Sequence, residues 1–158
     1  MTDWSIVEAG DGLKPIFVNL IQLYLYDLAA ELDFPIGSDG RYPYDYLERF
    51  WQHPYLIEED GVIVGFALVV DDCPLTGRSP CKFLAEFFIL KAYRRRGAGR
   101  WFFDAIRARH PGPWHVGVIR RNKAAMTFWR KCLDEEPSLV RSNHRFEGED
   151  WLVYAFSA

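Results

Sequence analysis

Residues 83–109 constrain the fold of this chain more than any other stretch. Residues 83–90 are a nearly unbroken apolar run, rich in aromatic and branched side chains, which predicts a buried β-strand. Three arginines and two glycines follow within residues 94–99, and apolar residues then recur at helical spacing from Trp101 to Ile106. A turn that opens a helix directs unpaired N–H groups outward, and here positive charge surrounds them. The stretch therefore predicts a binding site for a phosphorylated anion.

Two motifs identify the kind of anion. The turn lacks the Lys-Ser/Thr ending of a nucleotide-hydrolysing P-loop and the Gly-x-Gly-x-x-Gly order of a dinucleotide site. The pattern Arg94-x-x-Gly97-x-Gly99 instead resembles the pyrophosphate loop of the GCN5-related N-acetyltransferases, the GNAT superfamily. Residues 122–131 are similar to the second motif of that family, Asn-x-x-Ala-x-x-Phe-Tyr-x-Lys, and they lie one helix and one strand downstream, where the family has it.

The resemblance implies an α/β (α+β) fold with a mixed central sheet of six to seven strands and about four helices, in one domain over residues 1–158. The order of predicted elements, β-α-α-β-β-β-α-β-α-β-β, agrees with it. In the family two central strands splay apart to admit the pantetheine arm of coenzyme A, and here they would end at Leu90 and Ile119. We expect strands at 4–8, 55–58, 62–70, 83–90, 114–119, 139–145 and 151–156, and helices at 15–32, 45–51, from the glycine turn to about 110, and 123–133.

The same resemblance implies acetyl-CoA as co-substrate, with no metal. Backbone N–H groups of the turn would meet the pyrophosphate, arginine side chains would add charge, and the backbone of Ile89 and Leu90 would pair with the pantetheine arm. Leu90 N–H would also be the oxyanion donor. Asn122 would bond the arm from the other side, and Lys131 or Arg130 would approach the 3′-phosphate. The expected cofactor residues are Ile89, Leu90, Arg94, Arg95, Arg96, Gly97, Ala98, Gly99, Arg100, Asn122, Ala125, Phe128, Trp129 and Lys131.

Glu86 is the candidate general base. It is the only acidic residue in the apolar run, and a carboxylate is costly there unless it faces a cleft or a partner. Partial burial would raise its pKa towards the range in which it can accept a proton. The alternative is an ion pair with Lys82 or Arg120.

The general acid is undecided. The family motif has a tyrosine next to the phenylalanine, but position 129 is tryptophan, whose indole N–H donates hydrogen bonds and is not a usable acid. The thiolate would leave without help, or take its proton from water or from a tyrosine, for which the candidates are Tyr24, Tyr26, Tyr93 and Tyr154.

Charge is distributed unevenly along the chain, and this bears on the acceptor. Residues 1–60 hold 12 acidic and 3 basic side chains, residues 61–133 hold 4 and 14, and residues 134–158 hold 6 and 2, within a net charge of −3. A basic centre suits a polyanionic cofactor, and acidic flanks suit a cationic co-substrate. In the fold that the resemblance implies, the first helical region lines the acceptor side, so Tyr24, Tyr26 and Asp27 are predicted to bind a small cationic amine.

Other classes of function stay open or are disfavoured. The chain could acetylate a protein lysine or N-terminus, or it could be a catalytically weak CoA-binding sensor. The acidic flanks argue against nucleic-acid binding. No apolar run reaches transmembrane length, and no signal-peptide pattern begins the sequence. Three cysteines without metal-like spacing indicate ordinary thiols in a cytoplasmic protein, and exposed apolar residues in the terminal strands would support a homodimer.

Overall fold

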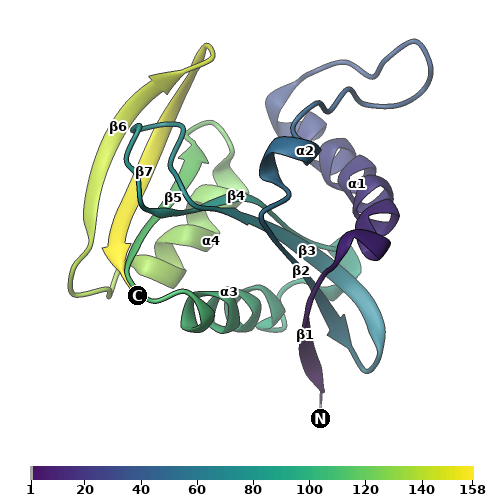
Figure 1. Cartoon of the computed structure of the whole chain (residues 1–158). Coiled ribbons are helices and arrows are strands. Elements are labelled where there is room, and N and C mark those ends of the chain that lie inside the picture. Colours follow the sequence, from purple (N-terminus) through teal and green to yellow (C-terminus); the bar gives the residue numbers. More distant parts are fainter. Residues whose placement is uncertain (1) are drawn as a thin grey trace.

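The computed structural model describes residues 2–158, which form a seven-stranded mixed sheet with four α-helices (Figure 1). The strand order is β1-β2-β3-β4-β5-β7-β6, and the neighbouring strands are antiparallel except for β4 and β5. This confirms the fold that the sequence motifs implied. The elements are β1 (Trp4–Glu8), α1 (Lys14–Leu32), α2 (Leu47–Phe50), β2 (His53–Glu59), β3 (Val62–Val70), β4 (Lys82–Ile89), α3 (Ala98–Arg109), β5 (Pro113–Ile119), α4 (Lys123–Leu133), β6 (Val140–Phe146) and β7 (Glu149–Ser157).

Helices cover both faces of the sheet. In Figure 1, α1 and α2 lie over one face of β2, β3 and β4, while α3 and α4 lie on the other. Phe17 and Ile21 of α1 pack with Phe66 of β3 on the first side, and Phe102 of α3 packs with Trp114 of β5 on the second. The centre of β3 is buried on both faces for this reason, which explains why its sequence is a continuous apolar run rather than an alternating one.

The parallel neighbours β4 and β5 stay together only at their start. Lys82 pairs with Trp114 and Phe83 with His115, after which the two strands separate. The rest of β4 therefore presents its backbone to a gap in the middle of the sheet, as the family resemblance implied.

A β-bulge in β4 decides which side chains face α1. Glu86 lies opposite Leu68 and Leu84 opposite Val69, so Ala85 is the extra residue between them. Downstream of the bulge Glu86 shares a face with Phe88, which packs in the cluster beneath α1. The carboxyl group of Glu86 is thereby placed on the α1 side of the sheet.

One predicted helix is shorter than expected. The helix predicted at 45–51 is the shorter α2, because Trp51 leaves helical geometry with ψ 64°. Cys73, Cys81 and Cys132 are buried free thiols. Among the helices of residues 2–158, none combines the length and apolarity that crossing a membrane requires.

Candidate active site

Glu86 is held between two tyrosine hydroxyls. The Tyr24 hydroxyl donates to Glu86 Oε1 at 2.9 Å, and the Tyr44 hydroxyl donates to Oε2 at 2.6 Å. The expected alternative, an ion pair with Lys82 or Arg120, does not form: Lys82 pairs with Asp71, and Arg120 donates to the side chain of Asn143. Neutral donors therefore position the carboxyl group without supplying a compensating positive charge.

This environment raises the pKa values of all three groups. Burial raises the pKa of Glu86 to about 7, although both tyrosine hydrogen bonds act in the opposite direction. Burial, and then the neighbouring Glu86 charge, raise the pKa values of Tyr24 and Tyr44 well above the ordinary phenol value. The tyrosines thus remain protonated near neutral pH, whereas the Glu86 carboxyl group titrates in this range.

The two tyrosines come from different elements. Tyr24 lies on α1, and its ring packs edge-to-face on Phe66 with centroids 5.6 Å apart. Tyr44 lies in the segment between α1 and α2, which Gln22 fixes: its side-chain amide donates to Tyr42 O at 2.9 Å and accepts from Tyr42 N at 2.8 Å. The sequence indicated Tyr24 but missed Tyr44. Tyr44 lies in an irregular segment with no periodic pattern that would predict its contact with Glu86 on β4.

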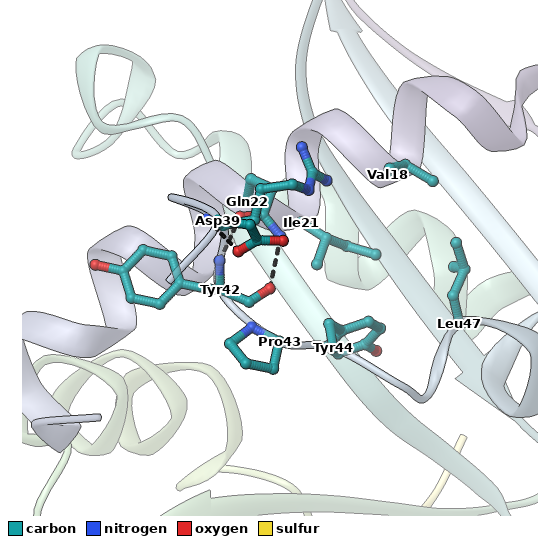
Figure 2. A pocket seen from close by; sticks show the side chains of 9 residues that line it. Val18, Ile21, Gln22, Asp39, Tyr42, Pro43, Tyr44 and Leu47 are labelled. Carbon is teal, nitrogen blue, oxygen red and sulfur yellow. Dashed lines mark hydrogen bonds between the residues drawn. The ribbon is translucent and has the colours of Figure 1, made fainter. Parts of the chain in front are cut away.

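A cavity of about 280 Å³ opens beside Tyr44 (Figure 2). The paired bonds between Gln22 and the Tyr42 backbone close one side, and Val18, Ile21 and Leu47 supply an apolar wall. Asp39 and Arg41 contribute both charge signs. The Tyr44 side chain contributes both to the cavity wall and, through its hydroxyl, to the Glu86 site.

The glycine turn at the start of α3 presents a run of free donors. Among residues 2–158, no acceptor lies within hydrogen-bond distance of the backbone N–H groups of residues 95–100. Arg95 has φ 63° and Gly97 φ 89°, the left-handed conformation that turns successive N–H groups to one side and makes an anion-binding concavity. The geometry fits the pyrophosphate of a coenzyme A molecule, which the sequence assigned to Arg95, Arg96, Gly97, Ala98, Gly99 and Arg100.

Gly99 is required for the contact between α3 and α4. A Cβ atom there would lie 2.9 Å from Cε1 of the Phe128 ring. The second sequence motif thus supports the first through direct packing, with Phe128 seated against the helix that carries the turn.

Three of the arginine side chains already have partners. Arg94 donates from Nε to Ile89 O at 2.8 Å and pairs with Asp27 at 2.7 Å. Arg96 pairs with the buried Glu59 at 3.2 Å. Arg100 pairs with Asp104 along its own helix at 3.1 Å.

The partner of Arg94 changes the expected role of Asp27. Its carboxylate joins α1 to the turn and is not a free group awaiting an amine. Tyr26, also expected to bind the acceptor, is 71% exposed and makes no hydrogen bond with a described residue. Of the three predicted acceptor residues, only Tyr24 contacts Glu86.

The expected role of Leu90 N–H also needs correction. This group donates to Val64 O of β3 at 2.8 Å and so points into the sheet. In an antiparallel ladder alternate residues bond the same neighbour, so the N–H groups of Ile89 and Phe87 face the gap. The hydrogen bond from Arg94 Nε to Ile89 O supports this direction. The N–H and C=O groups of one residue in an antiparallel strand point to the same side, so the Ile89 N–H also faces the gap.

Residues of the second motif line up along α4. The Asn122 side chain caps the helix by accepting from Ala125 N at 3.2 Å. Trp129 is 6% exposed and packs against Phe87, Phe103 and Phe128. Lys131 is exposed, and its carbonyl accepts from Arg100.

The comparisons with known proteins agree with this geometry. The family model described as the Acetyltransferase (GNAT) family matches residues 23–133, so the chain belongs to the GNAT acetyltransferase family, whose members are acetyl-CoA-dependent N-acetyltransferases. No curated protein matches the sequence.

Solved structures share the fold at low sequence identity. A GNAT-family acetyltransferase from Streptococcus agalactiae is 16% identical with a TM-score of 0.73, over 98% of this chain and 95% of that one. YncA, a putative acetyltransferase from Salmonella typhimurium solved with its cofactor acetyl-CoA, is 14% identical with a TM-score of 0.61, over 98% and 94%. Ribosomal-protein-alanine N-acetyltransferase from Brucella melitensis is 19% identical with a TM-score of 0.59, over 98% and 99%.

Proposed function

We propose that this protein transfers the acetyl group of acetyl-CoA to the primary amine of a small cationic molecule. The observation that carries the proposal is the Glu86 carboxyl group, with a pKa of about 7 between two tyrosine hydroxyls. A base with this pKa is about half ionised near neutral pH and still accepts a proton readily.

The residues around the gap fit acetyl-CoA. Six consecutive N–H groups at residues 95–100 would hold the pyrophosphate, and the N–H groups of Phe87 and Ile89 would face the arm. Acetyl-CoA supplies an acetyl group activated as a thioester.

Glu86 would prepare the acceptor for attack. An alkylamine has a pKa near 10 and reaches the site as an ammonium ion, which is not a nucleophile. Glu86 takes one proton from it, either directly or through the hydroxyl of Tyr24 or Tyr44. The N–H of Ile89 or Phe87 donates to the acetyl oxygen as negative charge develops there.

Tyr24 is the strongest candidate for returning a proton to the departing sulfur. It is the one tyrosine of the four considered from sequence that contacts Glu86. As Tyr24 donates its phenolic proton to sulfur, Glu86 replaces it with the proton taken from the amine. The carboxylate and the phenol are both restored by this exchange, and the second proton that the nitrogen loses on forming the amide leaves to water.

The cavity beside Tyr44 supports a small acceptor. Its volume of about 280 Å³ suits a compact molecule, with aromatic faces and the Asp39 carboxylate available to a cation. A protein N-terminus is the main competing acceptor, and one structural neighbour is a ribosomal-protein-alanine N-acetyltransferase.

Turnover of an amine panel tests the proposal. Thiol release from acetyl-CoA is measured with a diamine, an amino acid and an alanine-starting peptide, and we expect the diamine to give the highest kcat/KM. Glu86→Gln should lower kcat by about 100-fold or more, while the Kd for CoA from calorimetry stays the same. A peptide that outperforms every small amine would overturn the assignment of the acceptor.

Asp39→Asn examines the cavity separately. Removing this charge should raise KM for the diamine severalfold and leave the Kd for CoA unchanged. Asp72→Asn, at an exposed carboxylate in the β3–β4 connection, is the matched control and should change neither value. CoA binding without turnover of any amine would indicate the sensor instead.

A further inference from the structure

A second cavity lies beside α4, on the face opposite the residues of the second motif that pack into the core. It has a volume of about 530 Å³ and is bounded by one face of α4, the end of β5 and the strands β6 and β7. Ala125, Phe128 and Trp129 pack with the core cluster of α3 and β4, and none of them lines this cavity. We call it the α4–β6 groove. Its lining residues are Arg120, Lys123, Met126, Thr127, Arg130, Asp134, Arg141, Leu152 and Tyr154.

The groove is strongly basic in a protein of negative net charge. Four of its lining residues are arginine or lysine and one is acidic, in a chain whose net charge is −3. Asp134 pairs with Arg141 at 2.5 Å. Neither Lys123 nor Arg130 has a carboxylate within ion-pair distance among residues 2–158. Positive charge without neutralising partners concentrates anions in a concave surface.

Tyr154, a residue of the core, forms part of the floor. Tyr154 is 2% exposed, and its hydroxyl makes no hydrogen bond with any described residue. Within residues 2–158 no buried side-chain nitrogen or oxygen lacks a hydrogen-bond partner, so this hydroxyl reaches accessible surface. The surface that Tyr154 lines is the groove, where Arg141 lies directly opposite it in the β6–β7 register, with its guanidinium carbon 5.7 Å from the ring centroid.

These observations differ from those expected of an ordinary solvated basic face. A flat solvated face has no hollow of this volume, and it presents no unpartnered hydroxyl from a side chain of the core. Leu152 and Met126 make the rest of the floor apolar. The arrangement suits a compact ligand with negative groups at its rim and a hydrogen-bond acceptor that reaches the Tyr154 hydroxyl.

We propose that the α4–β6 groove binds a small polyanion, bearing phosphate or carboxylate groups, at a site separate from the acetyl-CoA site. The Lys123, Arg130 and Arg141 side chains bind the charged groups, and the Tyr154 hydroxyl donates one hydrogen bond to them. A macromolecular ligand is less suited, because only a small group reaches a hydroxyl on the floor of a groove of this size.

Calorimetric titration in saturating CoA tests the site, because CoA occupies the competing anion site at the α3 turn. The probes are inorganic pyrophosphate and citrate, which separate phosphate from carboxylate recognition. We expect at least one probe to bind. Lys123→Gln/Arg130→Gln should weaken binding of that probe by about tenfold or more, because it removes two charged hydrogen-bond donors.

Two further variants keep the test independent of misfolding. Tyr154→Phe removes only the hydroxyl and should weaken the probe by several-fold, with an unchanged Kd for CoA. Arg109→Gln removes an exposed arginine at the end of α3, outside the groove, and should leave probe binding unchanged. Absence of binding to both probes at millimolar concentration, or equal binding by all variants, would overturn the proposal.

Discussion

At the scale of single residues, the chemistry depends on how the protein holds one carboxyl group. Glu86 has a raised pKa because burial outweighs the two hydrogen bonds that favour its charged form. Removing either hydrogen bond leaves burial in place and takes away part of what opposes it. The two tyrosines therefore lower the pKa of Glu86, and removing either hydroxyl should raise that pKa by an amount that can be measured.

Tyr44→Phe should move the acidic limb of the activity profile, on which Glu86 ionises, to higher pH. Loss of the 2.6 Å hydrogen bond destabilises the carboxylate form, so the pKa of Glu86 rises further above 7. A hydrogen bond to a charged group is worth about 1.5–3 kcal/mol, which corresponds to about one to two pH units. The measurement is the pH profile of kcat. Tyr46→Phe, whose hydroxyl lies 3.5 Å from Glu147, is the control and should leave the profile unchanged.

Glu86 should also make stability depend on pH. Its folded-state pKa is raised from 4.5 to about 7, so between these values the folded protein binds more protons than the unfolded chain. The free energy of unfolding should consequently fall as pH rises through this window, by up to roughly 3 kcal/mol for this group. Urea unfolding at pH 5 and pH 8.5 checks this against Glu86→Gln, which should remove that part of the slope. An equal slope in both proteins would contradict it.

At the scale of elements, the turn that opens α3 depends on the helix that packs behind it. Gly99 lies where any Cβ atom would overlap the ring of Phe128, and this ring is fixed among Phe87 and Trp129. The two sequence motifs are thus parts of one packed unit, and a change in one displaces the other.

Gly99→Ala should damage both stability and cofactor binding. The Cβ atom would lie 2.9 Å from Phe128, so α3 and α4 must move apart, at a cost of about 1–3 kcal/mol in unfolding free energy. The free N–H groups of the turn move with α3, so we also expect weaker CoA binding. Gly12→Ala is the matched control, because no atom lies within 4 Å of the Cβ position there. Denaturant unfolding and calorimetry with CoA give the two readouts.

The sequence determined the elements better than the contacts between them. Hydrophobic periodicity and glycine placement were sufficient for all seven strands and for the turn, because these patterns are local. The direction of the Leu90 N–H depends on its hydrogen bond to β3, which the sequence does not reveal. The face of the sheet on which Glu86 lies depends on the bulge at Ala85. The pair of Arg94 and Asp27 joins residues that are 67 positions apart, and no local pattern reveals it.

At the scale of the whole molecule, the gap between β4 and β5 divides the sheet into two parts. One part contains β1 to β4 and the other contains β5, β7 and β6, and two residue pairs join them. A ligand that contacts both parts at once opposes their separation and binds only the folded state.

Acetyl-CoA should therefore raise the melting temperature. At a free concentration 100 times its Kd, a ligand of the folded state stabilises by about 2.7 kcal/mol, which corresponds to about 5–10 °C for a chain of this length. Thermal unfolding with increasing acetyl-CoA measures the shift, and Gly99→Ala should reduce it at equal concentration. No shift at millimolar acetyl-CoA would contradict a cofactor site in the gap.

The opened sheet has a consequence for the protein without its cofactor. Beyond the joined start of β4, its inner backbone is an unpaired strand edge, and such edges promote aggregation by pairing with other chains. The guanidinium of Arg94 lies on the carbonyl of Ile89 and places a charge on this edge. A charge at a strand edge opposes such pairing, which would explain an arginine here even though its guanidinium pairs with Asp27 rather than with phosphate.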